Sequence, residues 1–219
     1  MRALSVSMIL SFTAFAPVAG AEPKAPPAKV APAVTATKSA EIGKPAPDFT
    51  LKDLNGKTVK LSALRGKTVV LEWFNPGCPF VKRSHEIGSL VDTAKRRSNA
   101  SVVWLAINSN APGKQGSDPK ANADAAKRWS MAYPILMDDT GATGKAYGAT
   151  NTPHMFVIDN KGVLVYAGGI DNSPDAEQKS PEGGKLIKYV EAALDDLAAG
   201  KPVTRATSKA YGCSVKYGS

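Results

Sequence analysis

One segment sets the architecture of this chain: Thr68-Val-Val-Leu-Glu-Trp-Phe-Asn-Pro-Gly-Cys-Pro-Phe-Val-Lys-Arg83. Residues 68–74 are β-branched and aromatic, and the run is too short to favour a helix, so it predicts a buried strand. Asn75-Pro-Gly77 ends that strand, and Pro79 stands where a helix accepts proline best, in its first turn. The segment therefore predicts a strand, a tight turn and a helix that begins at Cys78.

The position of Cys78 indicates a functional thiol. A cysteine at a helix start is expected to face unpaired backbone N–H groups and the positive end of the helix dipole, and both favour the nucleophilic thiolate. Lys82 and Arg83 follow one turn later and act in the same direction. The alternative interpretation of Cys78 is a small buried hydrophobic residue.

Glu72 interrupts the apolar strand six residues before Cys78. Burying a charge is expensive, so we expect this carboxyl to be protonated at neutral pH or paired. A buried carboxyl beside a thiol can take or supply a proton during exchange; the alternative is an edge position where Glu72 points to water. We expect His85 to be an ordinary surface or half-buried histidine and His154 a polar residue at a strand start.

Four features in order resemble the exported redoxins of the AhpC/TSA group, a thioredoxin-like and peroxiredoxin-like family. They are Glu72, the run Cys78-Pro-Phe-Val81, the pair Thr152-Pro153 and the tail Tyr211-Gly-Cys-Ser-Val-Lys-Tyr217. The resemblance covers about residues 43–217. It implies an α/β, thioredoxin-like fold with a central mixed sheet flanked by helices and an N-terminal β-hairpin extension.

The resemblance also implies a substrate site. Thr152-Pro153 looks like the cis-proline pair that faces the cysteine in this fold, where the backbone of the residue before the proline pairs with a substrate peptide. Thr152 and Pro153 are therefore candidate substrate contacts, together with Pro79 and Phe80 next to the cysteine.

The sequence departs from both branches of this family. Val81 stands where thioredoxins carry their second cysteine, which argues against ordinary dithiol exchange. Asn75 and Leu71 stand where peroxiredoxins carry a threonine and a proline, which argues against efficient peroxide reduction.

Cys213 is the one possible intramolecular partner of Cys78, because the chain has two cysteines. Exported proteins usually keep cysteines paired, so we expect a Cys78–Cys213 bond, and Gly212 allows the tight turn that such an approach needs. A structural bridge and a redox-cycling bridge both remain open. No Cys-x-x-Cys or His-x3-His cluster is present, so we expect no metal site.

The ends of the chain predict export. Residues 1–21 have a short positive start, an apolar run and the small-residue site Ala19-Gly-Ala21, which is typical of a signal peptide. Residues 22–43 form a Pro/Ala/Lys-rich linker, 44–200 the redoxin domain, and 201–219 a tail that carries Cys213. After signal cleavage we expect no membrane span. The net charge is +9 without an arginine-rich arm, so we expect no nucleic-acid partner.

Periodicity predicts the remaining elements. Crossover helices between strands imply parallel pairing in the middle of the sheet. The expected strands are 49–52 and 58–60 around an Asn55-Gly56 turn, then 101–108, 134–137, 154–159 and 163–168. The expected helices are one helix from Cys78 to about Arg97, then 119–131, a turn at 143–147, and 185–198, followed by an irregular tail.

These observations predict an exported thiol-dependent oxidoreductase or antioxidant protein without a cofactor. Cys78 is the expected nucleophile on a peroxide or a protein disulfide, Cys213 its possible resolving partner, and an external dithiol protein the reductant. The alternative is a non-catalytic binding module on a thioredoxin-like scaffold, with a structural Cys78–Cys213 disulfide.

Overall fold

The computed structural model describes residues 39–87, 90–173 and 184–218. The predicted signal peptide and most of the predicted linker lie outside them. The strands are β1 (Thr50–Asp53), β2 (Thr58–Lys60), β3 (Thr68–Trp73), β4 (Val102–Asn108), β5 (Ile135–Met137), β6 (Asn151–Thr152), β7 (His154–Ile158), β8 (Leu164–Gly168) and β9 (Cys213–Ser214). The helices are the 3-10 turn η1 (Leu61–Leu64), α1 (Pro79–Glu86), α2 (Val91–Arg97), α3 (Pro119–Arg128), α4 (Ala142–Tyr147) and α5 (Tyr189–Ala198).

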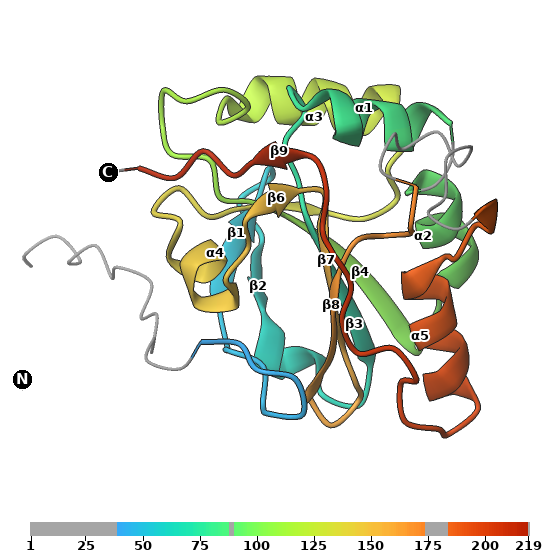
Figure 1. Ribbon diagram of the computed structural model, residues 1–219. Coiled ribbons are helices and arrows are strands. Elements are labelled where there is room, and N and C mark those ends of the chain that lie inside the picture. Colours follow the sequence, from blue (N-terminus) through green and yellow to red (C-terminus); the bar gives the residue numbers. More distant parts are fainter. Residues whose placement is uncertain (1–38, 88–89, 174–183, 219) are drawn as a thin grey trace, which may run out of the picture. The chain divides into compact units, whose positions relative to one another are not determined.

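Seven strands form one mixed sheet in the order β2-β1-β5-β4-β3-β7-β8. The three central strands β5, β4 and β3 run parallel, with Leu71 opposite Leu105, and β7 pairs antiparallel with β3. On the far side β1 pairs antiparallel with both β5 and β2. The predicted mixed sheet flanked by helices is confirmed, and the carboxyl end of β3 leads directly into the turn before Cys78 (Figure 1).

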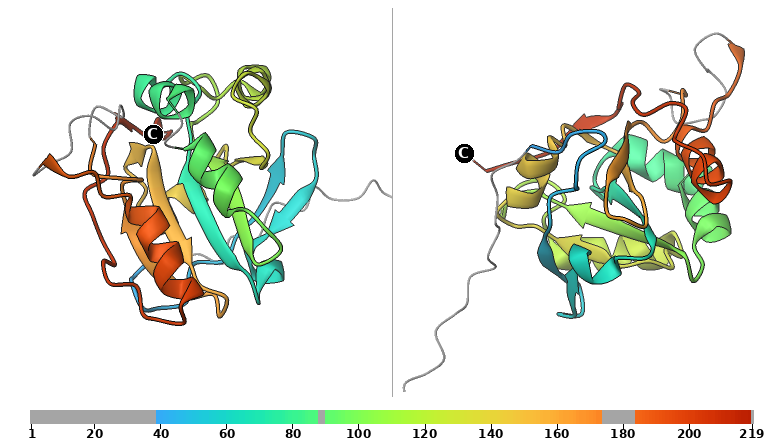
Figure 2. Two further views of the ribbon diagram at one scale, coloured as in Figure 1. Left: turned by 90° about the vertical axis from the view of Figure 1, so that its right-hand side faces the viewer. Right: turned by 90° about the horizontal axis from the view of Figure 1, so that it is seen from below.

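Alternation along β3 divides the core between the two faces of the sheet. Val69, Leu71 and Trp73 pack into the cluster on the face of η1 and α4, whereas Val70 packs with residues of α2 and α5 on the other face. This is the period-two pattern of a strand that is covered on both faces. A third cluster contains Cys78 and joins α1 to α3, and these two helices lie side by side in Figure 1 and in Figure 2.

The single helix predicted from Cys78 to about Arg97 is wrong. The structure has two helices: α1 ends where the Ile87 N–H bonds the Arg83 carbonyl, and α2 begins at Val91. Gly88 and Ser89, between the two helices, lie outside the described residues. Glycine and serine are weak helix formers, but the regular spacing of apolar residues on both sides favoured one continuous helix in the prediction.

The two ends of the domain hold more structure than we expected. Ala40 and Gly43, placed in the linker by their composition, donate backbone hydrogen bonds to Ala146 and Leu164 at 2.9 and 2.8 Å. The tail, predicted to be irregular, contains β9, which pairs antiparallel with β6 and lies beside it in Figure 1. A two-residue strand carries too little periodicity to be recognised in a sequence.

Candidate active site

Cys78 lies at the N-cap of α1 and is fully buried, at 0% exposure. Its backbone N–H bonds the Asn75 carbonyl at 3.0 Å, which closes the turn after β3. The side chain of Asn75 stabilises the same turn, since its Oδ1 accepts from the Gly77 N–H at 2.8 Å. Local turn chemistry thus positions the thiol at the end of the central strand.

Asn75 also ties this turn to the loop that precedes α3. Its Nδ2 donates to the Gln115 carbonyl at 3.3 Å, and Gln115 Nε2 donates to the Gly77 carbonyl at 3.1 Å. A Cβ on Gly116 would lie 2.0 Å from Asn75 Oδ1, so only glycine fits there. Asn75, noted in the sequence only as a departure from peroxiredoxins, therefore organises the cysteine turn.

The Cys78 thiol faces Thr152 rather than its own helix. Sγ donates a hydrogen bond to the Thr152 carbonyl at 3.0 Å, and the side chain makes no capping hydrogen bond to α1. The thiol thus makes no hydrogen bond to the free N–H groups of the helix that we expected it to face. The Thr152–Pro153 peptide is cis, as the family resemblance implied.

Cys213 lies in β9, in register with Thr152, so the same threonine faces both cysteines. Cys213 packs against the cluster that contains Cys78, and both cysteines are free in this structure, without the predicted bond between them. Burial raises the pKa of the Cys213 thiol to about 11, and the hydrogen bond and charge interaction with Cys78 act in the same direction. Cys213 is therefore a neutral thiol at pH 7.

Gly212 makes this approach possible. It has a φ of +108°, and a Cβ at this position would lie 2.2 Å from the Thr152 carbonyl oxygen. The predicted need for glycine before Cys213 thus has two physical reasons, the backbone conformation and the close passage of the tail over Thr152.

Glu72 is fully buried and hydrogen-bonded, so the prediction of a buried, paired carboxyl is confirmed and the edge alternative is wrong. Tyr133 donates its hydroxyl to Oε2 at 2.8 Å and Trp104 its indole N–H at 3.3 Å. His85 Nε2 lies 3.1 Å from Oε1. Burial, and next the Glu72 carboxylate, raise the pKa of Tyr133, so this phenol stays a donor.

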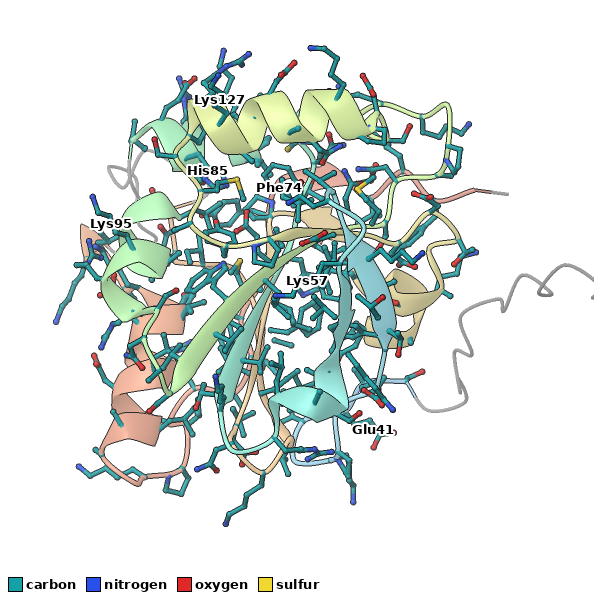
Figure 3. The ribbon with its side chains drawn as sticks, turned by 180° about the vertical axis from the view of Figure 1, so that it is seen from behind. Glu41, Lys57, Phe74, His85, Lys95 and Lys127 are labelled. Carbon is teal, nitrogen blue, oxygen red and sulfur yellow. The ribbon has the colours of Figure 1, made fainter. Side chains whose placement is uncertain are left out.

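The expectation that His85 is an ordinary surface or half-buried histidine is wrong, because its side chain is entirely buried. Its ring stacks on Trp129 with centroids 4.8 Å apart and meets Phe74 edge-on at 5.8 Å. Figure 3 shows His85 and Phe74 close together beneath α3. Trp129 and Phe74 both belong to the cluster that encloses Cys78. The signal in the sequence was the seven-residue spacing, which places His85 and Cys78 on one face of a helix.

The other predicted site residues lie around the two cysteines. Pro79 is exposed at the first position of α1, and Phe80 is half-buried, with its ring 6.4 Å from that of Tyr211 in the tail. His154 begins β7, as expected, and burial lowers its pKa to about 4, so it is neutral at pH 7.

Within the described part of the chain, no group of three or more His, Cys, Asp or Glu side chains is arranged to hold a metal ion. Across the same residues, no helix is long and apolar enough to cross a membrane.

The mixed sheet, the cysteine at a helix start and the cis-proline opposite it define a thioredoxin-like thiol protein. Residues 41–182 match the family model described as Redoxin, and the chain belongs to this family. Cys213 lies beyond the matched residues.

Relatives of known name come from both branches of the family. The chain is 31% identical over 122 residues to the thiol-disulfide oxidoreductase ResA of Geobacillus thermodenitrificans, covering 55% of this chain and 65% of that protein, just under two thirds. It is 35% identical over 146 residues to peroxiredoxin-2 of Rattus norvegicus, covering 59% and 69%.

Two solved structures are similar over most of the domain. A hypothetical protein from Sinorhizobium meliloti 1021 superimposes with a TM-score of 0.72 and 27% identity, covering 83% of this chain and 97% of that one. An uncharacterized conserved protein from Geobacillus kaustophilus gives 0.68 and 30%, covering 81% and 93%.

Proposed function

We propose that this protein is an exported thiol-dependent oxidoreductase in which Cys78 is the nucleophile and Cys213 the resolving thiol. The observation that carries the proposal is the position of Cys213: it lies in register with Thr152, whose carbonyl accepts from the Cys78 thiol, and it packs against the cluster that contains Cys78. A nucleophile without the second cysteine of thioredoxins needs another thiol within reach, and β9 supplies one. The signal-like segment 1–21 supports export.

The proposed cycle has three balanced steps. The Cys78 thiolate attacks one oxygen of a hydroperoxide, which breaks the O–O bond, gives a Cys78 sulfenic acid and releases an alcohol or water. The Cys213 thiol then condenses with the sulfenic acid, giving a Cys78–Cys213 disulfide and a second water. An external dithiol protein then reduces that disulfide and is itself oxidised to a disulfide.

Burial of the thiol favours a peroxide over a folded protein as the oxidising substrate. Cys78 is 0% exposed beneath Thr152 and β9, so a small oxidant reaches it with less rearrangement than a protein disulfide. In this proposal Pro79, Phe80 and the cis Pro153 line the approach to the thiol, and Glu72 exchanges a proton with the reacting groups through the hydrogen-bonded network around it.

The test is consumption of hydrogen peroxide and reduction of insulin disulfides by residues 22–219 with a dithiol reductant. Peroxide turnover without insulin turnover supports the proposal, and the reverse result selects a protein disulfide as substrate. Cys78→Ser should abolish both activities. Cys213→Ser should react once with peroxide and then stop, trapped as sulfenic or sulfinic acid.

One observation favours the non-catalytic alternative, a binding module held by a structural bridge. Hydrogen bonds hold the tail on both sides of Cys213, as expected for a segment whose role is to stabilise the fold. A structural bridge should resist mild dithiols and support no turnover, whereas a cycling bridge should be reduced and re-formed.

A further inference from the structure

Three consecutive polar residues are buried where β4 ends. Asn108, Ser109 and Asn110 are 0%, 1% and 0% exposed, although each carries side-chain hydrogen-bonding groups. Strand β4 runs parallel to β3, so its carboxyl end lies beside the turn that carries Cys78. Burying such groups without partners would be costly, so the hydrogen bonds that they make indicate which segments this run holds together.

The Asn108 amide uses its whole hydrogen-bonding capacity. Its Nδ2 donates to the Gly116 carbonyl and to Asn122 Oδ1, each at 2.8 Å. Its Oδ1 accepts from the backbone N–H and the side-chain Nδ2 of Asn110, at 3.0 and 2.7 Å. Two donated and two accepted hydrogen bonds fix the orientation of the amide group, so Asn108 joins the loop before α3 to Asn110.

Asn110 holds the tail. Its Oδ1 accepts from the Lys216 N–H at 2.9 Å, and the N–H of the next residue, Ala111, donates to the Lys216 carbonyl at 2.8 Å. Both backbone groups of Lys216 are therefore bound, three residues after Cys213. Since β9 is only two residues long, these bonds fix where the tail runs as it leaves the strand.

The loop that Asn108 holds also reaches the Cys78 turn. The carbonyl of Gln115 accepts from Asn75 Nδ2 at 3.3 Å, and Gln115 Nε2 donates to the Gly77 carbonyl at 3.1 Å. The Asn75 carbonyl in turn accepts from the Cys78 N–H at 3.0 Å. A series of hydrogen-bonded groups thus runs from the turn of one cysteine, through the end of β4, to the tail that carries the other.

We propose that Asn108 and Asn110 are positioning residues for the resolving step, because they hold the Cys213 tail and the Cys78 turn in one fixed arrangement. The inference rests on the proposed function, in which Cys213 condenses with oxidised Cys78. Both amides act through other residues: they raise the effective concentration of one thiol at the other, which is how orientation favours an intramolecular reaction.

The test is the equilibrium between the reduced protein and glutathione disulfide, which needs no peroxide. Formation of the Cys78–Cys213 bond reduces one glutathione disulfide to two glutathione molecules, so the glutathione ratio at half oxidation gives the effective concentration of the two thiols. Asn110→Ala releases the tail and should lower that concentration about tenfold, for the loss of two buried hydrogen bonds. Gln115→Ala releases the turn at an exposed position and should lower it about threefold.

A double variant and a control distinguish positioning from general stability. If the two residues act through one series of hydrogen bonds, Asn110→Ala combined with Gln115→Ala should lower the effective concentration about as much as Asn110→Ala alone. Thr93→Val removes a different buried hydrogen bond, which joins Thr93 Oγ1 to Glu191 Oε1 at 2.9 Å between α2 and α5, and should leave the effective concentration unchanged.

Three results would overturn the proposal. They are oxidation of either Asn110→Ala or Gln115→Ala at the glutathione ratio of the unaltered protein, effects that multiply in the double variant, and an effect of Thr93→Val as large as that of Asn110→Ala. Failure of the proposed function gives a different result, because the unaltered protein would then form no Cys78–Cys213 bond at any glutathione ratio.

Discussion

Glu72 is held in the core by the side chains that surround it. A charged group inside an apolar strand needs hydrogen-bond partners to offset its lost hydration. Tyr133 and Trp104 supply two donors to one carboxyl oxygen, and His85 faces the other. Three elements of the fold therefore converge to place one carboxyl beneath the cysteine helix.

We predict that Glu72→Gln slows oxidation of Cys78 by about 10²-fold, the lower end of what a general acid or base contributes, and alters the pH–rate profile. The shape is kept, so the fold should survive, with about 1–3 kcal/mol lost from the free energy of unfolding because one amide N–H now faces a donor. Stopped-flow measurement of single-turnover oxidation checks this. Glu86→Gln, the same change at an exposed glutamate of α1, is the control and should retain the profile; an unchanged Glu72→Gln profile removes Glu72 from the mechanism.

Cys213 gives the second prediction at this scale. Its pKa, raised to about 11, lies above working pH, so the attacking thiolate is scarce and becomes more abundant as pH rises. Closure of the disulfide in a single turnover should accelerate roughly tenfold per pH unit from pH 6 to 9. Burial is the largest cause of this shift. Quenched-flow mass spectrometry follows the closure, and a rate that is flat across this range would contradict the assignment.

At the scale of single elements, the position of β9 depends on the two residues after it. Val215 is buried against the core face of the sheet, and the Ala111 N–H donates to the Lys216 carbonyl at 2.8 Å. These contacts, more than the two-residue strand itself, hold Cys213 near Cys78.

Val215→Asp should therefore detach the tail, because a carboxylate cannot be buried in that cluster without a partner. Slow resolution exposes the sulfenic acid to a second peroxide, so we expect several-fold more sulfinic acid on Cys78 per turnover, measured by mass spectrometry. Ser214→Asp is the matched control, because position 214 is exposed and within reach of Lys216. In this variant Cys78 should stay protected from overoxidation to sulfinic acid. Equal overoxidation in both variants would mean that β9 does not govern resolution.

At the scale of the whole molecule, the fold joins two cysteines that are far apart in the chain. Cys78 and Cys213 are 135 residues apart (213 − 78), yet they meet across β6. A bond between them would close a long loop of the unfolded chain and, in the chain-entropy model, stabilise the fold by about 4–5 kcal/mol, less if strained.

We predict that non-reducing peptide mapping after mild oxidation finds the Cys78–Cys213 linkage, with a higher denaturation midpoint than the reduced protein shows. Cys213→Ser is the control and should gain no stability on oxidation. Two free thiols after treatment with peroxide would contradict both the linkage and the proposed cycle.

The sequence contained enough to predict the sheet and the buried Glu72, and the family resemblance pointed to the cis-proline pair. Strand β3 is long, apolar and β-branched, so local propensity and burial agree there. An ionisable side chain inside such an apolar run is costly to bury unless it has hydrogen-bond partners, so partners for Glu72 could be predicted. The glycine before Cys213 was recognised for its backbone freedom alone.

The contribution of the tertiary structure depends on contacts between distant segments. The enclosure of His85 depends on Trp129, which follows α3 and stacks on the imidazole ring. The structural role of Asn75 depends on Gln115, which hydrogen-bonds to the same turn. The largest addition is β9, whose two residues have no recognisable pattern of their own. They form a strand only because β6 offers them an edge, and pairing of that kind depends on register and geometry rather than on local propensity.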